Sequence, residues 1–167
     1  SLSYFRAIFS LYDAKFYVKA DDDIYLRPDR LSTLLAKNFS HPRLYIACMN
    51  LGNHVITDPE HKWFEPSSNL LGDKYFIYGL GTLYCLSTEV VEIIAALKND
   101  SLRILNNEDA NVGLWMLAFN VEHVDTAQLC MPECTENYIA VQMQYCGACD
   151  IEKRMVDLHD SDICSKN

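Results

Sequence analysis

The stretch YVKADDDIYLRPD, residues 17–29, places Asp21, Asp22 and Asp23 side by side after an apolar, β-branched run. Adjacent carboxylates raise one another's pKa and cost free energy unless a cation or a dense set of hydrogen bonds offsets the repulsion. In an extended chain, residues i and i+2 point to the same side, with their Cα atoms about 7 Å apart. Asp21 and Asp23 are therefore predicted to address one cation or one cation-bound ligand, while Asp22 points the other way.

Three other interpretations of the aspartates compete with a metal site. An EF-hand is a poor match, because its loop would place Leu26 where glycine is needed and Ser32 where glutamate is needed. A solvated acidic turn before the next helix remains open. So does a phosphotransfer site with Asp21 as the nucleophile. Carboxylates at the end of a strand suit a hard, oxygen-ligated ion such as Mg²⁺ or Mn²⁺. Such an ion takes its further ligands from substrate phosphates and water.

Hydrophobic periodicity around this stretch alternates between strands and helices, which predicts the α/β class. A long loop is expected over 52–72, and a Gly-Leu-Gly bend is expected to split 74–87 into two short strands. The other predicted strands are 15–20, 43–50 and 120–125. The predicted helices are an opening helix from residue 2, then 27–38, 87–100, 108–119 and 150–158.

Composition narrows the classes of partner. A formal net charge of -9 on 167 residues argues against nucleic acid and anionic membranes, since both would be repelled. The sequence has no run of about 18 apolar residues that could span a bilayer. Helical periodicity is already present at the first residues, so we expect a fragment that lacks an N-terminal part.

Cysteine usage indicates an oxidising compartment. Of the seven cysteines, five follow residue 129, and the sequons Asn38-Phe39-Ser40 and Asn99-Asp100-Ser101 agree with a secretory protein. Disulfides are favoured in this tail over a four-thiolate zinc site, although the spacing of the thiols permits zinc. Cys48 and Cys85 lie in apolar strands and are predicted to be buried thiols. The zinc alternative would use Cys130, Cys134, Cys146 and Cys149.

A second acidic pair opens the predicted helix 108–119. Glu108 and Asp109, in NNEDANVG, lie where carboxylates complement the helix dipole, which is a structural explanation for both. The functional interpretation makes one of them a general base, oriented by its neighbour, that accepts a proton from a hydroxyl nucleophile.

Three motifs together carry a family resemblance. YVKADDDIYL, YGLGTLYCLS and NEDANVG occur in the order and spacing found in the β-1,3-glycosyltransferases of glycosyltransferase family 31, from about Leu11 to Val124. The tail sequence CGACDIEKRMVDLH resembles a plant-like subgroup of hexosyltransferases. The resemblance implies a GT-A-like, Rossmann-related fold. Residues 1–167 would form the C-terminal portion of one such domain, with a cysteine-rich tail over about 128–167.

The resemblance also implies a function. The protein would be an inverting, metal-dependent hexosyltransferase. It would transfer a hexose, expected to be galactose from UDP-galactose, in β-1,3 linkage to a glycan or glycoprotein. The expected cofactor is Mn²⁺ or Mg²⁺, and the expected location is the Golgi lumen, as a type II membrane protein when complete. These 167 residues alone are expected not to turn over. A non-catalytic carbohydrate-binding or assembly module with the same fold is the alternative.

Carried over residue by residue, the resemblance makes Asp23, with Asp21, the metal ligand. Asp21 and Asp22 would lie near the nucleotide and its ribose. Asp109 matches the catalytic base and Glu108 its acidic partner. The remaining matches, near the donor sugar, are Gly81 and Tyr84.

Two positions depart from the family pattern, Leu83 in place of glycine and Ala110 in place of valine. The family's histidine ligand to the metal is absent downstream of the base. His123 is the nearest candidate for that ligand, although a structural role suits it better. Trp63 could stack on an acceptor sugar or pack under its loop.

Overall fold

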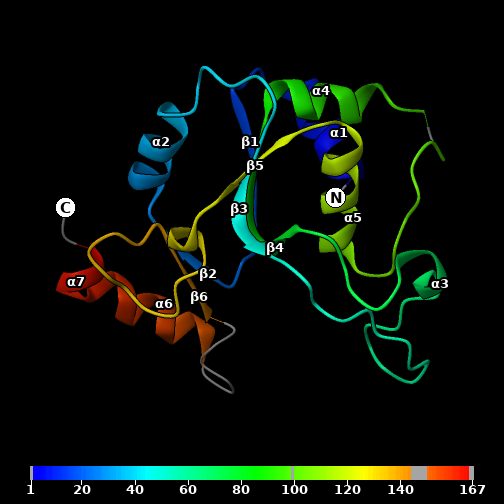
Figure 1. Ribbon diagram of the computed structural model, residues 1–167. Coiled ribbons are helices and arrows are strands. Elements are labelled where there is room, and N and C mark those ends of the chain that lie inside the picture. The colour runs from blue at the N-terminus through cyan, green and yellow to red at the C-terminus, as the bar shows by residue number, and fades with distance from the viewer. Residues whose placement is uncertain (1, 99, 144–149, 166–167) are drawn as a thin grey trace.

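The computed structural model describes residues 2–98, 100–143 and 150–165, which form a mixed sheet with helices on both faces (Figure 1). The four strands are ordered β1-β4-β3-β5, with β4 antiparallel to β1 and β3, and β5 parallel to β3. The predicted α/β class is confirmed at this level. The strands are β1 (Phe16–Ala20), β3 (Leu44–Asn50), β4 (Tyr78–Ser87) and β5 (Glu122–Asp125).

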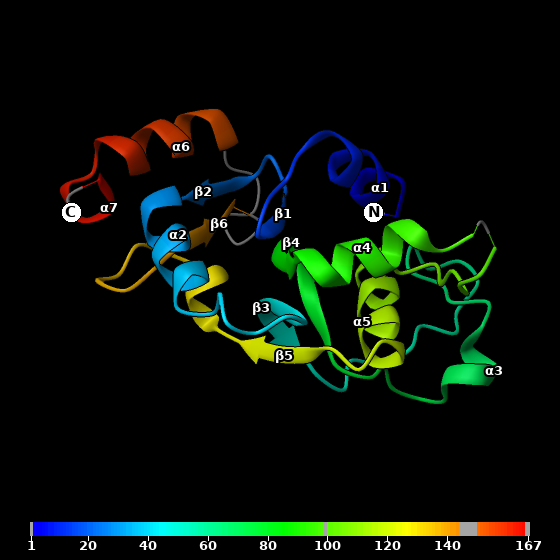
Figure 2. The ribbon, with the colours of Figure 1, turned by 90° about the horizontal axis from the view of Figure 1, so that it is seen from above.

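Helices α1 (Leu2–Leu11), α4 (Thr88–Ala96) and α5 (Glu108–Ala118) cover one face of the sheet (Figures 1 and 2). The other face carries α2 and a small second sheet of β2 paired with β6. No helix in the described part of the chain is both long and apolar enough to cross a membrane. The remaining elements are α2 (Pro28–Ala36), β2 (Ile24–Leu26), α3 (Ser68–Leu71), η1 (Ala127–Leu129), β6 (Ala140–Gln142), α6 (Ile151–Asp160) and α7 (Asp162–Ser165).

The central strand β4 supplies alternate side chains to two hydrophobic cores. Tyr84 and Leu86 pack with residues of α1, α4 and α5, whereas Leu83 and Cys85 pack with Leu31 of α2. This is the two-residue period of a strand buried on both faces. Burial of both faces fixes the register of β4 and, with it, the position of Gly81 at the end of the strand nearest the aspartates.

The prediction of two short strands around a Gly-Leu-Gly bend is wrong. Residues 78–87 form one strand, and its pairing with β3 shifts register between Ala47 and Met49. The glycines allow close packing instead of a turn. A Cβ on Gly79 would lie 2.4 Å from the Cβ of Ala47, so a side chain there would clash with the neighbouring strand.

Disulfides form in the tail, as favoured from the sequence, and one reaches into the sheet. Cys48 pairs with Cys130 and Cys134 with Cys164, while Cys85 is a buried free thiol. The prediction that Cys48 is a plain buried thiol is therefore wrong, because its partner lies 82 residues away and leaves no local signal. The zinc site is contradicted as well, since its two described members belong to different disulfides. Its other two members, Cys146 and Cys149, lie outside the described residues.

Removal of the Cys48–Cys130 disulfide is expected to cost more stability than removal of Cys134–Cys164. Their sequence separations are 82 and 30 residues, so loop-closure entropy gives about 4.5 and about 3.6 kcal/mol. Urea unfolding of the paired Cys→Ser variants measures both losses. A larger loss from the shorter loop would show that strain or residual structure, and not loop entropy, sets the order.

Candidate functional site

The three aspartates follow β1 directly and are held by backbone hydrogen bonds at both ends. The Asp21 N–H donates to the Thr82 carbonyl of β4 at 2.9 Å, and the Asp23 carbonyl accepts from the Met143 N–H at 3.0 Å. Asp21 and Asp23 line one cleft, whereas Asp22 is exposed and does not line it. The two carboxylates thus share one cleft, although Asp22 and Asp23 form a turn between β1 and β2 and not the extended chain expected from the sequence.

The second acidic pair lines the same cleft, 87 positions further along the chain. Asn107 caps α5, because its side-chain oxygen accepts from the N–H groups of Asp109 at 3.0 Å and Ala110 at 3.2 Å. This cap fixes the first turn of α5, which carries Glu108 and Asp109. We call the space between the two acidic pairs the acidic cleft; its walls include Lys19, Asp21, Asp23, Gly81, Glu108 and Asp109.

Gly81 is the point where β4 meets the Asp109 carboxylate. A Cβ built on Gly81 would lie 1.9 Å from Asp109 Oδ1, and its three nearest atoms all belong to that carboxylate. The carboxylate thus occupies the volume that any other residue at position 81 would fill. Lys19 secures the arrangement, because its ammonium group donates both to Asp21 and to the Gly81 carbonyl.

Burial raises the pKa of Asp109 above its ordinary value. The nearby Lys19 ammonium and the Gly81 backbone N–H oppose this shift, whereas the charges of Glu108 and Asp21 add to it. An aspartate whose pKa lies closer to neutrality is a stronger proton acceptor when ionised, which is the property a general base needs.

Among the described residues, no group satisfies one oxygen of Asp23. Its Oδ1 atom is buried and has no hydrogen-bond partner in this part of the chain, while the neighbouring Asp21 carboxylate is bound by Lys19. A buried carboxylate oxygen without a partner, in a cleft with excess negative charge, fits a divalent cation. The described residues contain no group of three or more histidine, cysteine, aspartate or glutamate side chains that could hold a metal ion. Such a cation would need ligands from phosphate oxygens or water.

A second cleft adjoins the first and shares Asp109 with it. Tyr78 stands on its wall, and the hydroxyl of Tyr78 accepts hydrogen bonds from the side-chain amides of Asn50 at 3.1 Å and Asn53 at 3.2 Å. Trp63, 47% exposed, lines both clefts. We call this space the aromatic cleft; its walls include Asn50, Asn53, Trp63, Tyr75 and Tyr78, together with Asp109.

A buried glutamate ties the 52–72 segment to the start of α5. Glu65 is 1% exposed, and its carboxylate accepts from the N–H groups of Ser67 at 2.9 Å and Asn106 at 2.7 Å. The Asn106 amide in turn donates to the Phe64 carbonyl at 2.7 Å. These bonds order the chain next to Trp63, which lines the same two clefts as Asp109. Glu65 was not predicted as a site residue, because its contact with Asn106 spans 41 positions. Lys19 stands in the motif YVKADDDIYL, but its contact with Gly81, 62 positions away, leaves no local signal.

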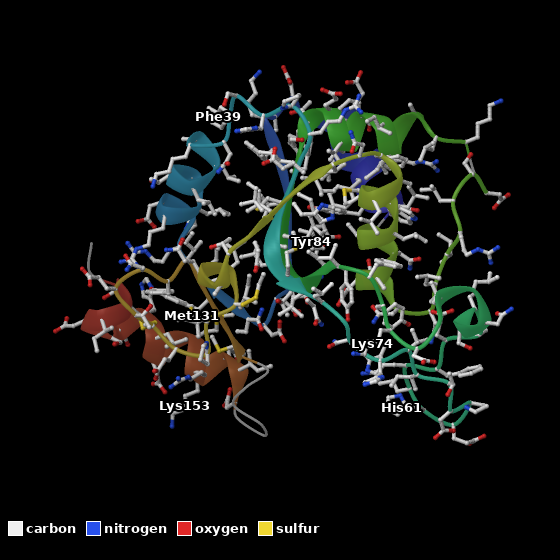
Figure 3. All side chains as sticks on the ribbon, in the orientation of Figure 1. Phe39, His61, Lys74, Tyr84, Met131 and Lys153 are labelled. Atoms are coloured by element: carbon white, nitrogen blue, oxygen red, sulfur yellow. A yellow bond between two sulfur atoms is a disulfide. The ribbon has the colours of Figure 1, made fainter. Side chains whose placement is uncertain are left out.

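Two candidates from the sequence lie away from both clefts. Tyr84 is 2% exposed, and its ring packs against those of Phe5 and Tyr45 inside the molecule (Figure 3). His123 packs edge-on against Tyr45, with its Nδ1 2.9 Å from the Val121 carbonyl. Neither lines the acidic or the aromatic cleft. The donor contact of Tyr84 stays a prediction, and the surroundings of His123 agree with a structural role.

Comparison with known proteins gives matches along the whole chain. Two relatives from Arabidopsis thaliana, named probable β-1,3-galactosyltransferases 13 and 12, are each 52% identical over all of this chain. The chain spans about half the length of these relatives, 49% and 45% respectively. The hydroxyproline O-galactosyltransferase HPGT1 of the same plant is 37% identical over 71% of the chain and 35% of its own length.

The family whose model matches is described as galactosyltransferase, and the match covers residues 1–127. It includes both acidic pairs, the Gly81 contact and Glu65. The cysteine-rich tail lies beyond the family match but within the alignments to the two Arabidopsis relatives. The chain therefore belongs to the galactosyltransferase family, identified from its sequence as glycosyltransferase family 31.

Proposed function

We propose that this protein transfers galactose from UDP-galactose, with inversion and in β-1,3 linkage, to a hydroxyl of a glycan or glycoprotein. The single observation that carries the proposal is the Asp109 carboxylate, which stands where the acidic and aromatic clefts meet. An inverting transfer needs one base between an acceptor and a donor that approach from opposite sides. We further propose that the mixed sheet is part of a GT-A-type domain.

The donor diphosphate is assigned to the acidic cleft. Asp23, with Asp21 beside it, would hold a Mn²⁺ or Mg²⁺ ion, which when bound supplies Lewis-acid stabilisation to the leaving diphosphate. Lys62 also lines this cleft and adds a positive charge on the side of Trp63. Lys19 neutralises Asp21, whereas the Asp23 Oδ1 atom has no hydrogen-bond partner among the residues that the structure describes.

The acceptor is assigned to the aromatic cleft. Its walls offer aromatic surface from Trp63, Tyr75 and Tyr78 and amide groups from Asn50 and Asn53. The faces of sugar rings pack on aromatic side chains, while their hydroxyls pair with amides and phenols. The Tyr78 hydroxyl accepts from two amides, which leaves its own proton to donate to an acceptor hydroxyl. An uncharged sugar is the class of acceptor that these groups would recognise.

Asp109 is proposed to take the proton from the attacking acceptor hydroxyl as the new glycosidic bond forms. Burial in a cleft that substrates close would exclude water and strengthen its interaction with that hydroxyl. Gly81 gives the carboxylate its position, and the Asn107 cap holds the helix turn that carries it. Glu108, on the same wall, raises the pKa of Asp109 and so favours uptake of the proton.

The Golgi lumen is the proposed location. Two disulfides support it, because such bonds form and persist in the secretory pathway and are rare in the cytosol. The names of the Arabidopsis relatives support a galactosyl donor, and HPGT1 is named for transfer to hydroxyproline oxygen. These names support galactosyl transfer as the class of reaction.

The binding of UDP by the complete protein tests the proposal. Asp23→Ala is expected to weaken Mn²⁺-dependent UDP binding at least about 10- to 100-fold, since even the partners of metal ligands are worth that much. Titration calorimetry with and without Mn²⁺ measures the loss. Asp13→Ala, an exposed carboxylate before β1, is the matched control and should bind as the parent does. Equal affinity of the Asp23 variant and the parent would remove Asp23 from the metal site.

A further inference from the structure

We propose that Asn38 carries an N-linked glycan whose first sugar covers the stacked rings of Phe16 and Phe39. The proposal goes beyond the transferase reaction and rests on it only for passage through the secretory pathway. It starts from the sequon Asn38-Phe39-Ser40, which the candidate active site does not use. The sequon lies in the turn that follows α2, at one end of the central sheet.

The geometry of Asn38 leaves room for the modification. The side-chain nitrogen Nδ2 donates to the Leu34 carbonyl at 2.9 Å, which uses one of its two hydrogens. Glycosylation replaces one amide hydrogen and leaves one, so the modified side chain keeps a donor of the kind that bonds Leu34. Backbone hydrogen bonds order the turn independently, because the Asn38 N–H donates to Leu35 at 3.0 Å and the His41 N–H to Asn38 at 3.2 Å. Phe39 and Ser40 are exposed.

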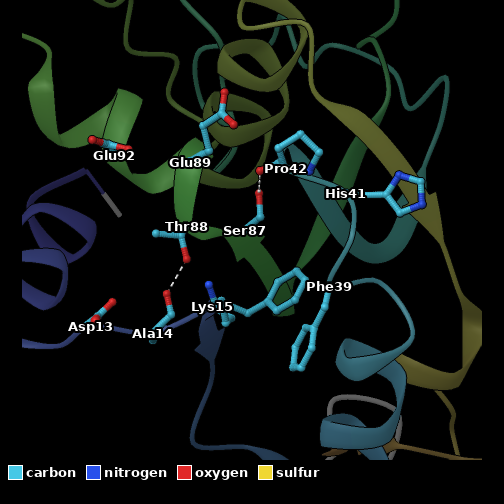
Figure 4. A pocket seen from close by; sticks show the side chains of 11 residues that line it. Asp13, Ala14, Lys15, Phe39, His41, Pro42, Ser87, Thr88, Glu89 and Glu92 are labelled. Carbon is cyan, nitrogen blue, oxygen red and sulfur yellow. Dashed lines mark hydrogen bonds between the residues drawn. The ribbon is translucent and has the colours of Figure 1, made fainter.

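An aromatic surface lies directly beside the sequon. Phe39 is 59% exposed and stacks on Phe16, with ring centroids 6.0 Å apart and an interplanar angle of 23°. The two rings line an open cavity whose walls also include His41 and Pro42 (Figure 4). Phe16 is half-buried against the core, so the exposed ring of Phe39 is the apolar surface that the cavity offers to a sugar. A pyranose attached to the preceding residue would lay its apolar face on these rings.

The position of the sequon keeps a glycan away from the catalytic cleft. Phe16 begins β1, whereas Asp21 follows its end, so the two lie roughly 16 Å apart along the strand. Phe39 and the 52–72 segment, marked by His61, lie at opposite ends of the molecule (Figure 3). A glycan on Asn38 would project from the end of the sheet that does not carry Asp109.

The modification itself is a transfer to nitrogen. The Asn38 Nδ2 atom bonds to the anomeric carbon of an oligosaccharide held on a lipid pyrophosphate, and the bond from that carbon to the pyrophosphate oxygen breaks. The lipid pyrophosphate leaves with the electron pair, and one amide proton is released. A neutral amide replaces a neutral amide, so the net charge of the turn stays the same.

The test uses the complete protein made in the secretory pathway of a eukaryotic cell. Trypsin cleaves after Lys37 and after Arg43, so it releases residues 38–43 as one peptide. Mass spectrometry is expected to find this peptide glycosylated in the parent and in Ser40→Thr, and unmodified in Asn38→Gln and Ser40→Ala. An unmodified parent peptide with the Cys48–Cys130 disulfide formed would overturn the glycan alone. With those cysteines reduced, both the proposed location and the glycan would fail.

A second measurement tests the packing on the rings. Trimming the glycan to its first sugar is expected to leave Tm unchanged, whereas removing that sugar should lower Tm by about 2–4 °C. In Phe39→Ser, which keeps the sequon, the same removal should have little effect, because the sugar no longer has its aromatic partner. An equal fall in parent and variant would overturn the packing.

Discussion

Asp109→Asn is expected to reduce galactosyl transfer by the complete protein by about 10²–10⁴-fold, the usual contribution of a positioned general base. The amide keeps the size of the carboxylate and its place against Gly81, but it cannot accept the proton of the acceptor hydroxyl. Mn²⁺-dependent UDP binding should persist, because that function is assigned to Asp23. Transfer rates and UDP affinity, measured on the same preparation, separate the two roles.

The pH dependence of transfer in the parent checks the same residue. Burial raises the pKa of Asp109, so the base is protonated and inactive up to a higher pH than an ordinary aspartate with a pKa near 3.9. The rate should therefore rise with pH through a limb that lies above that value. This limb should be absent from the residual activity of Asp109→Asn. If the residual rate of Asp109→Asn rises with pH over the same range as the parent's rate, a group other than Asp109 controls that pH dependence.

Stability distinguishes catalytic loss from misfolding. Because the folded pKa of Asp109 is raised, the folded state keeps its proton to higher pH than the unfolded state does. Ionisation therefore costs stability, and this cost grows as pH rises from the unfolded pKa through the folded pKa. Asparagine avoids the cost, so the Tm of the variant at neutral pH should equal or exceed that of the parent. Full transferase activity in Asp109→Asn would show that Asp109 is not the base, whereas a folded parent that binds sugar but transfers none would favour the non-catalytic module.

Local patterns in the sequence were sufficient for most of the elements. The alternation in 43–50 predicts a buried strand, and the leucine spacing in 27–38 predicts an amphipathic helix; both occur at β3 and α2. The bend expected in 74–87 failed because glycine has two uses. It allows a turn and it allows close packing, and only the neighbouring strand, with Ala47 against Gly79, decides between them.

The two acidic pairs could be found from sequence, whereas the contacts that position them could not. Lys19 stands in the same motif as Asp21, but nothing in the motif shows that it contacts Gly81, and Glu65 is an ordinary loop glutamate until the chain folds. Lys19 reaches across to Gly81, and Glu65 reaches across to Asn106. Long-range partners of this kind leave no periodic trace, and the same is true of the Cys48–Cys130 pair.

Gly81→Ala is expected to reduce the rate of galactosyl transfer by about 10²-fold or more. The substitution changes no side chain that accepts or donates a proton in the reaction. The new methyl group would lie 1.9 Å from Asp109 Oδ1, so the carboxylate must move by an ångström or more. Misplacement of that size typically costs about 100-fold in rate. Gly79→Ala is the matched control on the same strand. Its methyl group would meet Ala47 and Tyr45 in the core instead of the carboxylate.

Both alanine variants should lose about 1–3 kcal/mol of stability through overpacking, but only Gly81→Ala should lose specific activity in the folded fraction. Combining Gly81→Ala with Asp109→Asn separates positioning from other effects. If Gly81 acts through the carboxylate, the double variant should transfer no more slowly than Asp109→Asn alone. Multiplication of the two losses would mean that residue 81 serves the reaction by contacting the donor sugar, as its family position implies, and not by placing the base.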